Sequence, residues 1–254
     1  MPGDRVFTSS HGVPRNLSRR VYVLFVRAST SKLHELRSII VPHSIATSRA
    51  ERITPLILFA GYVALFVWGA INPYDRSTWW VENVPIVCVV ATLVVLYWRG
   101  VRFSPLAYVM MAVLPCWHTV GGHYTFERVP FGWFDHLFGF QRNMFDRVGH
   151  FTVGFFAFGI LEYLLERRAM SRTLACLFAV FTIGFVAMSY ELIEWLYAAY
   201  GGNAQAGANF LGSQGDVWDA QKDMLMDTIG GLTAVTLFLA LRRNENSRFA
   251  LGRG

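Results

Sequence analysis

The stretch GDVWDAQKDMLMDTIGGLTAVTLFLALRR, residues 215–243, joins an acidic segment to a long apolar one. At helical spacing Asp219, Asp223 and Asp227 lie on one stripe that covers about 12 Å of helix axis, with Asp216 at its mouth. The apolar run behind them predicts a membrane helix, so we expect the deepest aspartate below the membrane surface. An ionisable side chain there costs at least a few kcal/mol unless it faces a protein interior, so the stripe is a predicted functional site.

The composition of the whole chain is that of a membrane protein. Of its 254 residues 54% are hydrophobic, 15% aromatic and only 16% charged, and the mean hydropathy is +0.35. Most apolar stretches are long enough to cross a hydrocarbon core of about 30 Å. They predict an all-α polytopic bundle of about six transmembrane helices, at 53–71, 84–98, 103–120, 148–165, 174–196 and 224–241. The second stretch is short, and we expect Trp79, Trp80, Tyr97 and Trp98 to flank it as interfacial anchors.

Basic residues in the short loops predict the orientation of this bundle. They accumulate on one side and in the N-terminal segment, at Arg99, Arg102, Arg167, Arg168, Arg172, Arg242, Arg243, Arg15, Arg19, Arg20, Arg27, Lys32, Arg37, Arg49 and Arg52. Both termini are therefore predicted to be cytoplasmic. We expect a cytoplasmic, disordered extension at 1–52, a membrane domain at 53–241 and a short cytoplasmic tail at 242–254. The net charge of +6 then reflects topology, and a nucleic-acid surface is not expected.

Two pairs of polar residues fall on the opposite, outer side. Asp146 and His150 are four residues apart at the start of the fourth stretch, so their side chains share a helix face. Glu191 and Glu194 lie in the outer part of the fifth stretch. Two close carboxylates repel each other unless a cation or a shared proton intervenes. A carboxylate and an imidazole on one face suit a metal ion or a proton relay.

These pairs and the aspartate stripe together make one candidate site. Candidate ligands for a divalent metal are Asp146, His150, Glu191, Glu194, Asp223 and Asp227, and candidate catalytic groups are His150, Glu194 and Asp227. Asp216 and Asp219 are additional candidates, with helix capping as the alternative role. For the glutamates the alternative is a shared proton or an ion pair with Arg142 or Arg147.

The loop after the third stretch supplies two more candidates and a predicted lid. His118 and His123 flank Gly121 and Gly122, which predicts that the helix ends there and the chain turns. Gly230 and Gly231 predict close helix packing at the depth of the aspartates. The segment VPFGWFDHLFGF, 129–140, is too apolar for a free loop. We expect it to lie in the interface as a re-entrant or amphipathic lid over the bundle, which suits a lipid-like substrate.

Several sequence blocks closely resemble those of the YjdF-like inner-membrane proteins of bacteria. The blocks are GGHYTFERVPFGW at 121–133, RNMFDRVGHF at 142–151, YELIEW at 190–195 and FLGSQGDVWDAQKDMLMDTIGG at 210–231. NPYDRSTWWVENVP, 72–85, looks like the first external loop of that family. The resemblance covers about residues 53–241 and implies a bacterial inner-membrane location. The first fifty residues have no counterpart in it, which supports treating them as an extension or a mis-set start.

A shorter pattern is similar to that of the VanZ-like membrane proteins. It consists of a helix-start Asp and His, a later Glu and an Asp-x3-Asn-x2-Gly helix, matched in order by Asp146, His150, Glu194, Asp223, Asp227 and Gly230. Asp227 stands where that pattern has Asn. Neither resemblance implies a reaction.

Three classes of function remain open. The first is a metal-dependent membrane enzyme acting on a lipid-linked or periplasmic substrate, with one or two divalent ions that activate water or a substrate phosphate. The second is a small cation or proton-coupled transporter. Its path to the cytoplasm would have only Glu162 and Glu166, which we interpret as surface ion pairs with neighbouring arginines. The third is a structural or resistance-associated protein whose polar cluster fixes helix packing. No nucleotide-binding loop, serine elbow or haem-attachment motif occurs.

Overall fold

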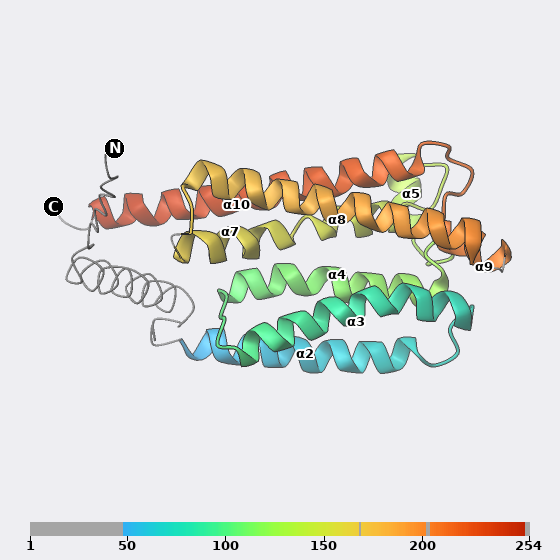
Figure 1. Cartoon of the computed structure of the whole chain (residues 1–254), viewed down its shortest axis with the longest axis horizontal. Helices are drawn as coiled ribbons and strands as arrows, with labels where there is room; N and C mark the ends of the chain where they lie inside the picture. The colour runs from blue at the N-terminus through green and yellow to red at the C-terminus, as the bar shows by residue number, and fades with distance from the viewer. Residues whose placement is uncertain (1–47, 168, 202–203, 252–254) are drawn as a thin grey trace, which may run out of the picture. The chain divides into compact units, whose positions relative to one another are not determined.

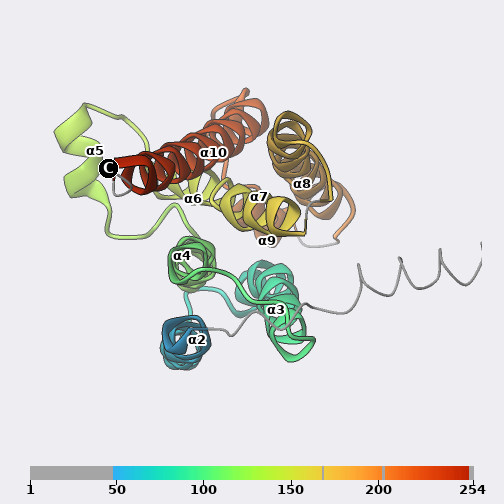
Figure 2. The ribbon, with the colours of Figure 1, turned by 90° about the vertical axis from the view of Figure 1, so that its left-hand side faces the viewer.

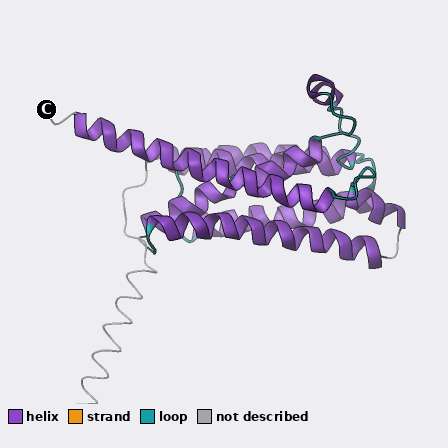
Figure 3. Ribbon diagram, turned by 90° about the horizontal axis from the view of Figure 1, so that it is seen from above, coloured by secondary structure: helices purple, strands orange, loops and turns teal. Residues whose placement is uncertain are grey.

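Each predicted apolar stretch lies on a helix in the computed structural model, which describes residues 48–167, 169–201 and 204–251. All regular elements among these residues are helices (Figure 3). In chain order they are α2 (Arg49–Gly69), α3 (Arg76–Trp98), α4 (Pro105–Tyr124), α5 (Gly132–Phe138), α6 (Phe145–Val153), α7 (Phe156–Glu166), α8 (Arg172–Tyr200), α9 (Ala204–Leu211) and α10 (Asp219–Leu251). The predicted polytopic helical membrane bundle is confirmed.

Five segments are long and apolar enough to cross a membrane: α2, α3, α6 with α7, α8, and α10 as far as Arg242. Helix α4, which the sequence predicted as a sixth crossing, is not among them. It lies at the centre, packed on α2, α3, α6 and α7 (Figure 2), and half of its residues are buried. Because neighbouring helices shield it from lipid, α4 can carry polar residues such as His118 and Thr119.

The bundle has two distinct ends. Helix α2 begins and α10 ends at the same one, which we call the terminal end, and the opposite one is the distal end (Figure 1). Helix α2 begins at Arg49, four residues before the predicted membrane domain at 53. A capping box starts it, in which the backbone N–H groups of Ser48 and Glu51 each donate to the other's side chain at 3.1 Å. Residues 242–251 of the predicted tail continue α10. The predicted extension lies almost wholly outside the described residues.

Helix α3 begins eight residues before the predicted apolar stretch. Asp75 is its N-cap and accepts a hydrogen bond from the Thr78 backbone N–H at 2.6 Å. Trp79 is therefore inside the helix, only 2% exposed, and packs on Phe66 at a ring-centre distance of 5.4 Å. The expectation that Trp79 is an interfacial anchor is wrong, because the apolar run alone could not locate the cap.

Helix α4 does not end at Gly121 and Gly122 as predicted but continues to Tyr124. Other residues use the bare backbone of these glycines as a packing surface. A Cβ on Gly121 would meet the Phe126 ring at 2.4 Å, and one on Gly122 would meet Asn83 Nδ2 at 2.9 Å. The two glycines therefore mark close packing rather than a helix end.

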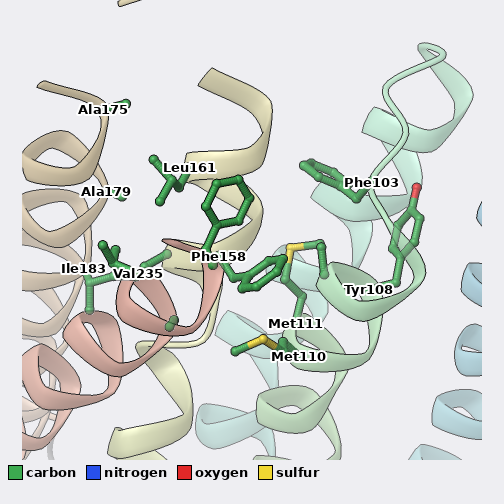
Figure 4. Close-up of a cluster of buried hydrophobic side chains, with 14 residues drawn as sticks. Phe103, Tyr108, Met110, Met111, Phe158, Leu161, Ala175, Ala179, Ile183 and Val235 are labelled. Carbon is green, nitrogen blue, oxygen red and sulfur yellow. The ribbon is translucent and has the colours of Figure 1, made fainter. Parts of the chain in front are cut away.

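The terminal half of the bundle is apolar. Figure 4 shows side chains of α4, α7, α8 and α10 meeting there, among them Met111, Phe158, Ile183 and Val235. Glu162 at its edge is only 3% exposed and is not the predicted surface ion pair. Its carboxylate accepts hydrogen bonds from the backbone N–H and the hydroxyl of Ser104, the N-cap of α4, at 2.6 and 2.5 Å.

Helices α6 and α7 are one predicted stretch, interrupted by a turn at Gly154 and Phe155. There they cross α10 with backbone against backbone. A Cβ on Gly154 would lie 2.1 Å from the Gly231 nitrogen, and one on Gly230 would lie 2.0 Å from the Phe151 carbonyl oxygen. The predicted close packing at Gly230 and Gly231 is confirmed. It brings α6 and α10 together one helical turn from the polar residues described next.

Candidate functional site

The aspartate stripe faces the protein, and its burial increases with depth. Asp219 is 8% exposed, Asp223 2% and Asp227 0%. Helical spacing alone places them on one face, and the glycine crossing turns that face toward α6.

His150 on α6 lies at the centre of four carboxylates. Its Nδ1 is 3.2 Å from Asp227 Oδ2. Its Nε2 points to the other three, with Asp146 Oδ1 at 3.7 Å and one oxygen each of Glu191 and Asp223 at 3.9 Å. Helices α6, α8 and α10 thus bring five of the predicted ligands together.

Two arginines of the distal loop and α6 pair with the aspartates rather than with the glutamates. Arg147, 5% exposed, lies 2.5 Å from both Asp219 Oδ1 and Asp223 Oδ1, and Arg142 forms a second ion pair with Asp219. Asp216 accepts a hydrogen bond from Lys222 at 2.6 Å, which lowers the pKa of this aspartate. Asp216 and Asp219 therefore belong to an ion-pair network at the distal rim.

The inner carboxylates exceed the positive charge beside them. Glu191 Oε1 and Asp227 Oδ1 are buried oxygens without a hydrogen-bond partner. Glu191 is 8% exposed and Asp227 is 0% exposed. Arg147 already serves Asp219 and Asp223, and His150 supplies at most one further charge. Buried carboxylates in such excess require a cation or shared protons.

A second polar group faces this cluster and was only partly predicted. Glu82 on α3 is 2% exposed, its Oε2 is 3.0 Å from His118 Nε2, and it accepts a hydrogen bond from the Tyr190 hydroxyl at 3.2 Å. His118 was a candidate, whereas Glu82 and Tyr190 were missed. Recognising the cap at Asp75 would have placed Glu82 seven residues inside an apolar helix. Like Asp227, it would then have been an ionisable residue in a membrane helix and a candidate for the site.

One pocket lies between the two groups. It offers about 130 Å³ to the centres of water molecules. Acidic residues, histidines and a tyrosine make its polar part, contributed by Glu82, His118, Asp146, His150, Tyr190, Glu194 and Asp227. Glu194 reaches the site here, lining the pocket rather than contacting His150. Glu191 and Asp223 approach the same Nε2 of His150 as Asp146 but are not among the residues that line the pocket.

Two sequence-based expectations place residues away from this pocket. His123 Nδ1 lies 3.0 Å from the Gly69 carbonyl oxygen and its ring stacks on Trp68, so it does not join the site. The segment 129–140 forms α5, on the side of the bundle away from α3 and α8 (Figure 2). None of its residues lines the pocket. The segment predicted as a lid over the bundle therefore does not cover this pocket, and its Trp133 and Leu137 are 66% and 70% exposed.

The residues around His150 suit a divalent metal. Ligand atoms of Asp146, His150 and Asp223 lie within 4.8 Å of one another. Two ligands about 2.1 Å from a tetrahedral ion are about 3.4 Å apart, so binding would draw the side chains inward. Asp227 on Nδ1 holds the ring so that Nε2 faces the other carboxylates, the arrangement in which a carboxylate supports a metal-binding histidine.

The fold and the cluster define a multi-pass helical membrane protein with buried carboxylates and histidines at one end of its bundle. The chain belongs to the family described as a predicted membrane protein, DUF2238, whose profile matches residues 54–244. It is 33% identical over 207 residues to inner membrane protein YjdF of Escherichia coli (strain K12), across 78% of this chain and 96% of that protein. No solved structure matches the chain significantly. The resemblance to YjdF-like proteins is confirmed.

Proposed function

We propose that this chain is a metal-dependent inner-membrane enzyme that hydrolyses a phosphoester of a lipid-linked or periplasmic substrate. One observation carries the proposal. Helices α6, α8 and α10 surround His150 with four carboxylates, three of them buried and two with an oxygen that has no partner, beside a pocket with a second acid and histidine on its far wall. Purely structural polar clusters are normally satisfied by their own hydrogen bonds.

The residues divide into a metal side and a proton side. Asp146, His150 and Asp223 would hold the ion, which would polarise the phosphate and lower the pKa of water. The water oxygen bonds to phosphorus while the P–O ester bond breaks, and a water proton passes to a carboxylate such as Glu194. The departing alcohol oxygen takes a proton from the Glu82–Tyr190 pair across the pocket. Hydrolysis is then balanced with water as the only co-reactant.

The distal end would face the periplasm. Seven basic residues of the described loops and helix ends support this, since they lie at the terminal end, at Arg49, Arg52, Arg99, Arg102, Arg167, Arg172 and Arg242. Basic residues also occur at the distal end, contrary to the expectation of one-sided accumulation. Four of them pair with acids and one with a backbone carbonyl, namely Arg128, Arg142, Arg147, Lys222 and Arg76.

Metal analysis of the purified protein tests the proposal. Wild type should hold about one or two equivalents of Mg, Mn or Zn after incubation and desalting. Asp223→Asn with Asp227→Asn, which keeps side-chain volume, should lose most of it, and Asp223→Ala with Asp227→Ala should do the same. Glu127→Gln, an acid outside the cluster, is the matched control. A wild-type protein that takes up no stoichiometric metal would overturn the metal-dependent reading.

The other two classes are less well supported. A transporter needs a polar path from the cluster to the terminal end, but the described core there is apolar. The carboxylate of Glu162 already accepts two hydrogen bonds from Ser104. A purely structural cluster predicts a different result in the same experiment. Wild type would then contain no metal, and the double asparagine variant would melt below the wild-type temperature, because it removes a charged partner from both Arg147 and His150.

A further inference from the structure

The pocket has an apolar part that the proposed chemistry does not use. Pro85, Ile86 and Val89 of α3 and Val186 and Ala187 of α8 line it. Both helices place these residues nearer the middle of the bundle than the polar ones. From Glu194 to Val186 and from Glu82 to Val89, about 12 and 10 Å of helix axis lead away from the distal end.

The two helices that carry these residues meet at the hydrogen bond from Tyr190 to Glu82, and neither is a main packing partner of the other. Helix α3 packs on α4 and α9, whereas α8 packs on α6, α7, α9 and α10. Val186, which lines the pocket, is 47% exposed, and Val89 is half-buried. The pocket therefore has an opening between α3 and α8 at a depth where a membrane protein meets lipid, and Figure 2 shows both helices on the same side of the bundle.

Helix α9 covers the distal side of the same pocket. Phe210 lines the pocket, is 3% exposed, and packs on Tyr197 at 5.1 Å and on Tyr190 at 6.4 Å between ring centres. Gly212, which follows α9, also lines it. Phe210 and Gly212 thus close part of the distal side of the pocket, whereas Val186 on its α8 wall remains exposed.

The size of the pocket limits what can enter. Space of about 130 Å³ for water centres holds on the order of ten water molecules. That accommodates a phosphate with its ester oxygens and the first part of an attached chain. It does not accommodate a whole lipid, whose chains must therefore stay in the bilayer.

Resting on the proposed function, we infer that the substrate class is a phospholipid of the surrounding bilayer, which enters sideways between α3 and α8. Its phosphate would bind at the ion beside His150. Without the ion, the carboxylates would repel this anion. Its glycerol and upper acyl carbons would lie against Ile86, Val89 and Val186, and its chains would remain in the membrane. The apolar wall thus selects a lipid-borne phosphate over a free periplasmic one.

Native mass spectrometry of detergent-purified protein, after exchange into lipid-free detergent, tests this inference. Wild type should retain about one phospholipid per chain. Val89→Trp and Val186→Trp, which fill the opening, should lower this occupancy at least tenfold. Val87→Trp is the matched control, because it adds the same ring to α3 outside the pocket and should retain lipid like wild type. Melting curves of all four proteins identify folded variants, and the half-exposed Val186 position tolerates a large ring.

Metal content measured on the same samples separates the two proposals. Stoichiometric metal with equal lipid retention in all four proteins would overturn lateral entry and leave the metal proposal intact. If the wild type contains no metal and only Val89→Trp and Val186→Trp lose lipid, lateral entry is supported and the proposed metal dependence is overturned. Retention of an isoprenoid phosphate in place of a phospholipid would overturn the assigned lipid class.

Discussion

Replacing Gly154 by alanine tests the helix crossing on which the whole site depends. The added Cβ would lie 2.1 Å from the Gly231 nitrogen and 2.2 Å from the Gly230 carbonyl carbon, whereas ordinary contact begins at 3.4 Å. Neither neighbour is a side chain that can rotate away. The α6–α7 segment and α10 must therefore separate by about 1.3 Å, the difference between 3.4 and 2.1 Å.

The separation acts directly on the cluster. His150 lies one turn before Gly154 and Asp227 one turn before Gly231, so their 3.2 Å contact would lengthen beyond hydrogen-bond range. Overpacking of this kind costs about 1–3 kcal/mol. We expect Gly154→Ala to lower the melting temperature of the detergent-purified protein, followed by tryptophan fluorescence, and to weaken metal binding.

Two other helical glycines provide matched controls. A Cβ on Gly61 or on Gly184 would meet nothing within 4 Å. Alanine is favoured over glycine inside a helix by roughly 0.5–1 kcal/mol, so Gly61→Ala and Gly184→Ala should leave the melting temperature unchanged or raise it. If Gly154→Ala melted at or above the wild-type temperature, the backbone contact between α6–α7 and α10 could not exist as described.

Three further predictions concern charges. Asp227→Asn should weaken divalent-metal binding about 10–100-fold in calorimetric titration because it replaces the carboxylate partner of His150 Nδ1 by a neutral amide; an unchanged affinity would contradict that role. Arg147→Met should destabilise the protein by about 3–5 kcal/mol in thermal melting, since it leaves buried carboxylates unpaired, whereas Arg128→Met at the rim should cost less than about 1 kcal/mol. The Thr78 N–H lowers the pKa of Asp75, so this cap stabilises the fold at neutral pH and is lost only as the pH falls through that lowered pKa, below about 4. Asp75→Ala should cost about 1 kcal/mol at pH 7 and less at pH 3, and equal losses at both pH values would refute the ionised cap.

Local patterns predicted the helices well and their ends poorly. Apolar runs identify where a chain can cross a bilayer because the requirement is length and hydropathy alone. The ends depend on caps and on packing partners. Asp75 caps α3 before the predicted apolar stretch, so Glu82 was not assigned to a helix. Helix α4 continues through Gly121 and Gly122, whose bare backbone lies against Phe126 and Asn83.

The choice of partners was outside the reach of the sequence for a related reason. The sequence allowed Arg142 and Arg147 to pair with either the glutamates of α8 or the aspartates of α10. The crossing at Gly154 brings α6 against α10, so the arginines pair with the aspartates. The pairing of Glu82 with His118 and Tyr190 likewise joins three helices that no periodicity relates.

By itself, the sequence determined that this chain is a helical membrane protein and that Asp219, Asp223 and Asp227 share one face, because hydropathy and helical spacing are local properties. Tertiary structure alone decided which residues that face meets. It brought His150 within 3.2 Å of Asp227 and placed Glu82 on the far wall of the pocket beside them. Such contacts depend on how closely two backbones can approach, and that is set by both helices together.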